Sequence, residues 1–414
     1  FAKTDMIHLQ QGATPDFEII AGLCQAMARN LKSNIGKGKT ITPPVAFQGG
    51  VAHNLGVRQA FRQVFGFDDA GLIIPPHFCA LGAVGAVLVA RENLPADFSL
   101  GLEPLRRHLQ QQSEQTRHLE RLTPPKPLGP EDYQVVDIPA GAVVESYLGI
   151  DVGSISTNVV VIDPEGRVLA REYLMTAGRP LEAITEGLRR VGAKIGGQVK
   201  IMGAATTGSG RYLTGDFIGA DLVRNEITAQ ATAAAAIDPE VDTIFEIGGQ
   251  DSKFISLSNG AIVDFMMNKV CAAGTGSYLE EQAEKLGISI REEFGRLALE
   301  SKHPVRMGER CAVFMESDIV HHQQRGAARE DLVAGLSYSI VQNYLNKVAE
   351  DRPIGKRIFY QGATAANRGI VAAFQQVCGK PITVPPHHDV TGAIGAALLA
   401  MRERDWEVSR FKGF

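Results

Sequence analysis

A sequence repeat between the two ends of the chain constrains its fold more than any other feature. Two pairs of segments match in the same order: residues 43–54 with 355–367, and residues 75–86 with 385–396. The first pair shares an apolar run followed by Gln-Gly, small residues and Asn, and the second pair begins with Pro-Pro-His. Internal similarity of this kind indicates a repeated structural unit. We therefore expect residues 1–93 to be the C-terminal part of a module whose complete copy begins near Tyr147.

The segment between the copies differs from both in composition. Residues 102–122 are rich in helix formers and hold no Gly or Pro after Pro104, whereas residues 123–130 are dominated by Pro. This pattern predicts a helix followed by an extended, semi-rigid spacer. The sequence thus predicts a partial module over 1–93, a helical and Pro-rich linker over 94–146, and a complete module over 147–407. Because Phe1 aligns with Phe314, we also expect the chain to start inside a domain.

Within the complete module, one turn combines a thiol with glycines. Cys271 lies three residues before Gly274-Thr275-Gly276, between the strand-like run 262–267 and the helix-forming run 279–286. The start of a helix offers unpaired N–H groups and a positive dipole end, which suit a phosphate. The same field lowers the pKa of a thiol and favours a metal-binding thiolate. The alternative is that Cys271 is a small apolar residue in a strand-to-helix bend.

Residues 147–163 read as two strands joined by a Gly- and Ser-rich turn, a hairpin rather than a nucleotide-binding loop followed by a helix. In such a turn Asp151 can hold a hydrated Mg²⁺ ion. Gly153, Ser154 and Ser156 can supply N–H and hydroxyl donors to phosphates. Taken alone, this pattern is also that of an ordinary turn.

A second hairpin of the same kind follows a strand predicted over 243–247. Its turn begins with Gly248 and Gly249, which predict a second phosphate cradle, and continues with Gln250 and Asp251. Either polar side chain can orient a water molecule that attacks a phosphate, or one bound to Mg²⁺. Two such turns in one module predict a nucleotide site more strongly than either turn alone.

The rest of the module supplies a second thiol and a place for a nucleoside. Cys311 stands at a predicted helix start, as Cys271 does. Gly362, Ala363 and Asn367 form a glycine turn before a helix, which suits ribose or purine packing, and the helix that begins at Gly392 has small residues that permit close approach. Other residues are expected to be structural: Cys24 and Cys378 in the core, His387 and His388 in loop packing.

Bulk composition excludes some classes of function. The 414 residues carry 46 acidic and 42 basic side chains, so no basic surplus points to nucleic acid. We find no apolar run of membrane-spanning length and no signal peptide, and expect a cytoplasmic protein without a membrane partner. The five cysteines are few and scattered, which argues for core residues or ligands rather than disulfides.

Together these motifs resemble those of one ATPase family. It includes the activators of 2-hydroxyacyl-CoA dehydratases and the ATP-hydrolysing components of benzoyl-CoA reductases (BadF/BadG/BcrA/BcrD type). The family falls within the superfamily of acetate and sugar kinases, Hsp70 and actin. The resemblance covers residues 147–402, with its C-terminal piece repeated in 1–93. It rests on four motifs: Gly149 to Ser154, Gly248 to Lys253, Cys271 to Gly276 and Cys311 to Phe314.

The resemblance implies an α/β fold, the actin-like ATPase fold of two ribonuclease H-like lobes, preceded by a partial copy of the same module. It also implies that Cys271 and Cys311 bind one four-iron four-sulfur cluster (4Fe-4S), which a homodimer holds at its interface, and that ATP or ADP binds with Mg²⁺. Ala363 departs from the family, which usually has a second Gly there, and this bears on nucleotide affinity.

By resemblance, the expected function is that of an ATP-dependent one-electron donor, or activase. Its partner would be a 2-hydroxyacyl-CoA dehydratase-like, benzoyl-CoA reductase-like or double-cubane iron–sulfur protein, and its own electron donor a ferredoxin or flavodoxin. Two alternatives remain at this point. One is a small-molecule kinase, in which Asp251 is the base for a substrate hydroxyl, and the other is a nucleotide-switched binding module.

Overall fold

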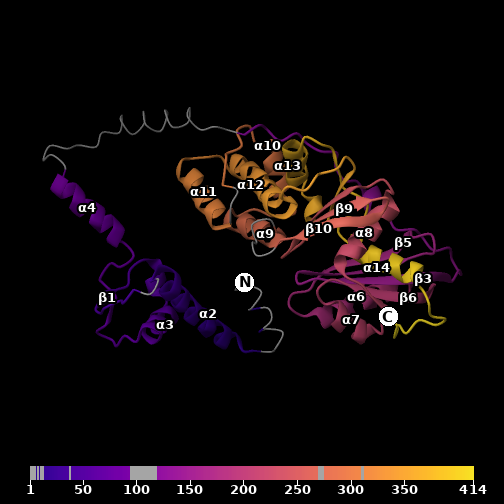
Figure 1. Cartoon of the computed structure of the whole chain (residues 1–414), viewed down its shortest axis with the longest axis horizontal. Coiled ribbons are helices and arrows are strands. Elements are labelled where there is room, and N and C mark those ends of the chain that lie inside the picture. The colour runs from indigo at the N-terminus through magenta and orange to yellow at the C-terminus, as the bar shows by residue number, and fades with distance from the viewer. Residues whose placement is uncertain are drawn as a thin grey trace. The chain divides into compact units, whose positions relative to one another are not determined.

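The computed structural model describes residues 14–36, 39–93, 119–268, 275–308 and 312–414, together with Met6 and Leu9. The chain divides into two units, Phe1–Gln110 and Gln111–Phe414 (Figure 1). Within the described ranges, none of the helices combines the length and the apolar character needed to cross a membrane.

The first unit is a small α/β assembly around a core that includes Cys24, Ala28, Val57 and Phe61. Its elements are, in chain order, α2 (Asp16–Asn30), a π-helical turn (Leu31–Ile35), β1 (Val45–Ala46), a 3₁₀ turn (Gly50–His53), α3 (Leu55–Phe65), β2 (Leu72–Ile73) and α4 (Leu81–Asn93). Strands β1 and β2 pair in parallel. The predicted core position of Cys24 is confirmed, because only 7% of the residue is exposed.

The end of the second unit repeats this order of elements. It consists of α12 (Arg329–Tyr344), a π-helical turn (Leu345–Ala349), β11 (Ile358–Gln361), a 3₁₀ turn (Ala363–Ala366), α13 (Arg368–Cys378), β12 (Ile382–Thr383) and α14 (Thr391–Arg402). Local details match too: Gly49 and Gly362 have φ of +94° and +92°, and Asn54 and Asn367 cap the helices that follow. The first unit thus has the same order of elements as the C-terminal part of the second unit.

Two five-stranded sheets of identical topology form the two lobes of the second unit. The first has the order β5-β4-β3-β6-β7, with β3 (Val144–Val152), β4 (Ser156–Ile162), β5 (Val168–Met175), β6 (Val199–Thr207) and β7 (Leu222–Val223). The second has the order β10-β9-β8-β11-β12, with β8 (Thr243–Ile247), β9 (Ser252–Ser258) and β10 (Ala261–Met267). In each sheet three antiparallel strands are followed by two that are parallel to the first. This is the predicted ribonuclease H-like arrangement.

Two helices of small residues join the lobes (Figure 1). Helix α14 packs on the first sheet, where a Cβ atom on Gly149 of β3 would lie 1.9 Å from the carbonyl oxygen of Ala393. Helix α8 (Glu226–Ile237) packs on the second sheet through Ile227, Ala231 and Ala234. The two helices meet so closely that a Cβ atom on Gly395 would lie 1.8 Å from the carbonyl oxygen of Ala229. Any side chain at Gly395 therefore forces the helices apart.

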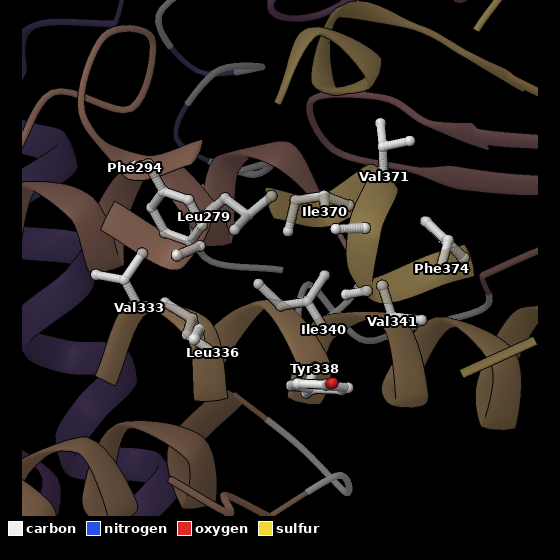
Figure 2. Packing of buried hydrophobic residues seen from close by; sticks show 14 of the residues in the cluster. Leu279, Phe294, Val333, Leu336, Tyr338, Ile340, Val341, Ile370, Val371 and Phe374 are labelled. Atoms are coloured by element: carbon white, nitrogen blue, oxygen red, sulfur yellow. The ribbon is translucent and has the colours of Figure 1, made fainter. Parts of the chain in front are cut away.

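Helices α6 (Pro180–Ile195) and α7 (Arg211–Ile218) belong to the first lobe. In the second lobe, α9 (Gly276–Lys285), α10 (Phe294–Glu300), α12 and α13 surround the largest core cluster of the described residues. Figure 2 shows Leu279, Phe294, Leu336 and Ile370 of these helices converging in it. Helix α11 (Ala312–Gln324) contributes Met315 and Ile319 to the same cluster.

One local expectation, the helix over residues 102–122, differs from the structure where the chain is described. Residues 119–122 are not helical, because Leu122 is drawn into the core of the second lobe; residues 94–118 of the expected linker lie outside the described part.

Candidate nucleotide-binding cleft

A cavity of about 1030 Å³ lies in the second unit, lined by residues of both lobes. Its volume is at the upper end of the range typical of small-molecule sites. The cavity brings together these residues that the sequence singled out: Asp151, Ser156, Gly248, Gly249, Gly276, Gly362, Ala363, Asn367 and Gly392. They come from five separate segments of the chain.

Other predicted residues lie beside the cavity or outside the described part. Gly153, Ser154, Gln250, Asp251 and Thr275 are described but are not among the residues that line it. The N–H of Gly153 donates to the carbonyl of Ser156 and so closes the first hairpin. Cys271, Gly274 and Cys311 fall outside the described residues.

Asp151 stands near the end of β3, where the chain turns into β4. Its carboxylate is held in a space that only glycines leave open: a Cβ atom on Gly208 would lie 2.4 Å from Oδ1, and one on Gly392 would lie 2.1 Å from Oδ2. Burial raises the pKa of Asp151 to about 7, while Lys253 lowers it and Glu246 raises it. A buried carboxylate with so high a pKa is one that a bound cation would stabilise in its charged form.

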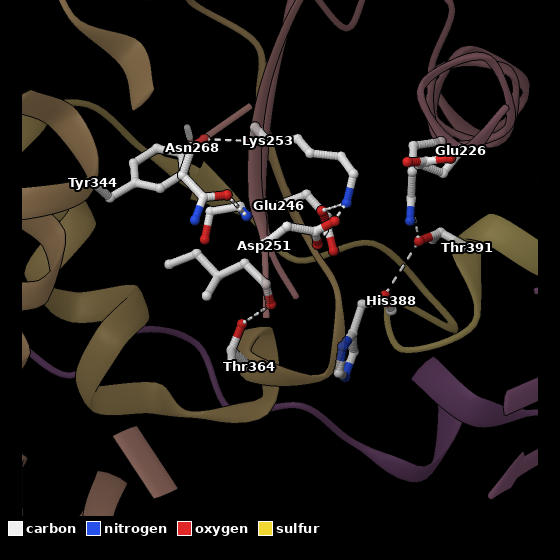
Figure 3. Close-up of polar contacts among 12 residues, drawn as sticks. Glu226, Glu246, Asp251, Lys253, Asn268, Tyr344, Thr364, His388 and Thr391 are labelled. Atoms are coloured by element: carbon white, nitrogen blue, oxygen red, sulfur yellow. Dashed lines mark hydrogen bonds and ion pairs between the residues drawn. The ribbon is translucent and has the colours of Figure 1, made fainter. Parts of the chain in front are cut away.

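The second hairpin carries a buried charge cluster (Figure 3). Lys253 on β9 donates to Glu246 of β8 and to Asp251 of the turn, each at 2.9 Å. Only 6% and 7% of the Lys253 and Glu246 side chains are exposed. Burial alone would lower the pKa of Lys253, but the two carboxylates outweigh it and raise the pKa, so the ammonium group stays charged. The lysine thereby fixes both carboxylates in place.

The start of α9, the first helix after Cys271 in the sequence, is bonded to this second hairpin. The N–H groups of Gly276 and Ser277 donate to the carbonyls of Gly248 and Gly249, both at 2.9 Å. These N–H groups are therefore not open to phosphate, which differs from the expectation of unpaired donors at this helix start. Instead, the start of α9 and the Gly248–Gly249 turn form one connected piece of backbone.

The opposite end of the cavity suits a nucleoside. Gly362 adopts a φ of +92°, which favours glycine, whereas Ala363 begins a 3₁₀ turn without positive φ. Ala363, which the sequence analysis marked as a departure from the family pattern, is thus accommodated by the backbone. Asn367 caps α13 through Oδ1, while its Nδ2 and the Nε of Arg368 are buried without a protein hydrogen-bond partner. Both residues line the cavity, so these donors are available to a ligand.

The donor set fits Mg²⁺ and a nucleotide. The phosphate end offers oxygen ligands, which Mg²⁺ prefers, from Asp151, Glu246, Asn158 and Thr391. The Oδ1 of Asn158 is buried without a protein partner, and the Thr391 hydroxyl donates to Gln230 at 2.7 Å. Among the described residues, no group of three or more His, Cys, Asp or Glu side chains is arranged to hold a metal ion by itself.

Sequence reasoning missed several residues of this site. Glu246 is the one charged residue of β8 and Lys253 the one charged residue of β9, a signal that could have marked them. Asn158 faces Asp151 across the β3–β4 hairpin, which only the strand register reveals. Tyr133 and Pro124 line the cavity from the expected linker, and nothing in their local sequence indicated that.

Two ribonuclease H-like lobes around a cleft with two hairpin cradles define an actin-like ATPase. The chain belongs to the BadF/BadG/BcrA/BcrD ATPase family, whose model matches residues 1–90 and 148–400.

The relatives each match about three fifths of this chain. The chain is 32% identical over 258 residues to the 2-hydroxyisocaproyl-CoA dehydratase activator of Clostridioides difficile, which covers 62% of this chain and 95% of that protein. It is 31% identical over 260 residues to the (R)-2-hydroxyglutaryl-CoA dehydratase activating ATPase of Acidaminococcus fermentans, covering 62% and 97%. It is 33% identical over 262 residues to the uncharacterized protein MJ0800 of Methanocaldococcus jannaschii. That match covers 61% of this chain and only 61% of the length of MJ0800.

Solved structures agree with this relationship. The crystal structure of component A of the (R)-2-hydroxyglutaryl-CoA dehydratase of Acidaminococcus fermentans matches with a TM-score of 0.57 and 30% identity, covering 62% of this chain and 98% of that one. The activator of the 2-hydroxyisocaproyl-CoA dehydratase from Clostridium difficile with bound ADPNP matches with a TM-score of 0.57 and 31% identity, covering 62% and 95%.

Proposed function

We propose that this chain is an ATP-hydrolysing activator that delivers one electron to a partner iron–sulfur enzyme. The names of its relatives support a partner of the 2-hydroxyacyl-CoA dehydratase or benzoyl-CoA reductase kind; a double-cubane iron–sulfur protein is the third candidate. In each cycle one electron enters from a ferredoxin or flavodoxin and one leaves to the partner. ATP and water become ADP, phosphate and a proton.

Nucleotide binding is assigned to the cleft. Ser156 of the first hairpin and Gly248 and Gly249 of the second line the cavity and are assigned to the phosphates, and Gly362, Ala363 and Asn367 are assigned to the nucleoside. Gly276 and Gly392 also line the phosphate side, where the N–H of Gly276 is already bonded to Gly248. Gly153, Ser154, Gly274 and Thr275 are assigned to the same side by their places in the sequence motifs. Asp151 holds Mg²⁺ through water, and the ion when bound offsets phosphate charge during hydrolysis.

The second hairpin orients the attacking water. Gln250 has a buried Nε2 without a protein partner, and Asp251 is fixed by Lys253. We assign Gln250 and Asp251 to positioning the water in line with the terminal phosphate. Glu246 lines the cavity and accepts a hydrogen bond from the same lysine.

One observation carries the coupling of nucleotide to electron transfer. The turn that cradles the phosphates, Gly248–Gly249, accepts hydrogen bonds from the first two residues of α9. Helix α9 begins at Gly276, shortly after Cys271 in the sequence. A shift of the cradle on ATP binding or hydrolysis is therefore passed through these hydrogen bonds to the start of the helix that follows the thiol in the chain.

We assign Cys271 and Cys311 as the thiolate ligands of a four-iron four-sulfur cluster shared by a homodimer. Each stands directly or within a few residues before a described helix, and the two helices, α9 and α11, share a core and the ion pair between Lys285 and Glu316 at 2.7 Å. A cluster bound by such thiolates takes up and releases one electron.

Iron and sulfide analysis of the anaerobically purified chain tests this proposal. The expected result is four irons and four sulfides per two chains by the cluster type, lost in Cys271→Ser and in Cys311→Ser. The matched control is Cys79→Ser, since Cys79 is an exposed free cysteine of the first unit. Retention of iron in Cys271→Ser would refute the ligand assignment. A phosphorylated small molecule formed at the rate of ATP turnover would identify a kinase instead.

A further inference from the structure

The described part of the segment that precedes the complete module packs against that module. Leu122 is 1% exposed and belongs to the core of the second lobe. The N–H of Leu119 donates to the carbonyl of Pro304 at 2.8 Å, and the Tyr338 hydroxyl donates to the carbonyl of Glu120 at 2.8 Å. This end of the segment lies on helices α12 and α13 of the second lobe (Figure 1).

The far end of the same segment lies on the other lobe. The N–H of Val136 donates to the carbonyl of Val168 in β5 at 2.8 Å. Val136 and Ile138 pack against the core of the first lobe. Residues 119–138, which we call the strap, therefore run from one lobe to the other.

Between its two anchors the strap reaches the cavity. Pro124 and Tyr133 both line it. Arg368, at the first position of α13, donates to the carbonyl of Pro125 at 3.2 Å, next to the nucleoside end of the cavity. The strap thus forms a wall of the cleft that comes from outside the two lobes.

Tyr133 connects the strap to the glycine turn through one histidine. The Nδ1 of His388 lies 3.0 Å from the carbonyl oxygen of Gly362, and its Nε2 lies 2.9 Å from the Tyr133 hydroxyl. A carbonyl only accepts, so Nδ1 carries the proton. Burial lowers the pKa of His388, which keeps the imidazole neutral and leaves Nε2 to accept from the tyrosine. Arg171 stacks its guanidinium on the tyrosine ring at 5.5 Å from the ring centre.

We propose that the strap is part of the nucleotide site, with Pro124 and Tyr133 as its outer wall, so that a bound purine nucleotide holds residues 119–138 closed against both lobes. This rests on the proposed nucleotide binding in the cleft. Tyr133 is a positioning residue, since it acts on the glycine turn through His388.

Hydrogen–deuterium exchange of the full chain, with and without Mg²⁺ and ADP, tests this inference. Bound ADP should slow exchange of the strap amides as well as those of the glycine turns. The Tyr133→Phe variant keeps the ring and loses the hydroxyl, so its Kd for ADP should rise about fivefold, the loss expected for one net hydrogen bond. The matched control is Tyr212→Phe, because Tyr212 is 68% exposed on α7 and lies outside the cavity lining.

The outcomes separate this inference from the proposed function. If the wild-type chain binds ADP while strap exchange stays the same, the strap inference is wrong and nucleotide binding stands. An unchanged Kd in Tyr133→Phe would likewise remove Tyr133 from the site. If the wild-type chain binds no ADP, the proposed function fails and the strap inference fails with it.

Discussion

Replacing Lys253 by Met should destabilise the second unit strongly. The ammonium group is buried, with 6% of the side chain exposed, and it is bonded to Glu246, whose side chain is 7% exposed. Met keeps much of the apolar volume of the lysine stem but removes the charge. Glu246 is then buried without its cation. Its carboxyl group must either stay charged without a partner or take up a proton, and both states cost free energy.

The structure sets the size of the effect. Removing one partner of a buried ion pair costs about 3–5 kcal/mol of unfolding free energy. The third member of the cluster, Asp251, is 43% exposed and adds little, because solvent screens it. For a domain of this size the loss corresponds to a drop in Tm of roughly 10 °C.

The assay is thermal unfolding of wild type, Lys253→Met and the double variant Lys253→Met/Glu246→Gln. Removing the carboxylate as well should restore a large part of the lost Tm, since no unpaired buried charge remains. Lys285→Met is the matched control, because Lys285 also pairs with two glutamates but has a side chain that is 43% exposed. Its loss of unfolding free energy should be at most about 1 kcal/mol, and its drop in Tm correspondingly small. Equal effects of Lys253→Met and Lys285→Met, or no recovery in the double variant, would refute the buried-cluster reasoning.

Two further predictions concern Asp151 and the helix crossing. Burial raises the pKa of Asp151 from 3.8 to about 7, so the folded state favours its protonated form; without metal or nucleotide, stability should fall as pH rises from about 4 to about 7 through this group. Asp151→Asn should flatten that part of a Tm-versus-pH curve, and an unchanged slope would contradict the assignment. Gly395→Ala places a Cβ atom 1.8 Å from the Ala229 carbonyl oxygen and should cost about 1–3 kcal/mol or more in chemical unfolding, whereas Gly197→Ala, with nothing within 4 Å, should cost far less.

Local sequence patterns predicted most of the fold because they coincide with local structure. The strand over 243–247 occurs with the predicted bounds, since its apolar run dictates it without help from the rest of the chain. The two hairpins were also predictable from their glycine turns. The helix expected up to residue 122 is absent at residues 119–122, because the burial of Leu122 depends on parts of the second lobe that are far away in sequence.

Site residues that belong to one short sequence motif were predictable. Those that the fold brings together from distant segments were missed. Asp151 and the turns at Gly248 and Gly362 follow from short motifs. The contact of Tyr133 with His388 joins residues 255 positions apart, so no local pattern contains it. The bonding of α9 to the Gly248–Gly249 turn was likewise hidden, and it changes how that helix start is understood.

The most direct test of the coupling is the reduction potential of the anaerobically purified wild-type chain, measured once with Mg²⁺ and ADP and once with Mg²⁺ and ADPNP. We expect two different midpoint potentials, because the phosphates act on the Gly248–Gly249 turn and that turn is bonded to the helix after Cys271. An iron-bearing protein whose potential is the same with both nucleotides would contradict the coupling.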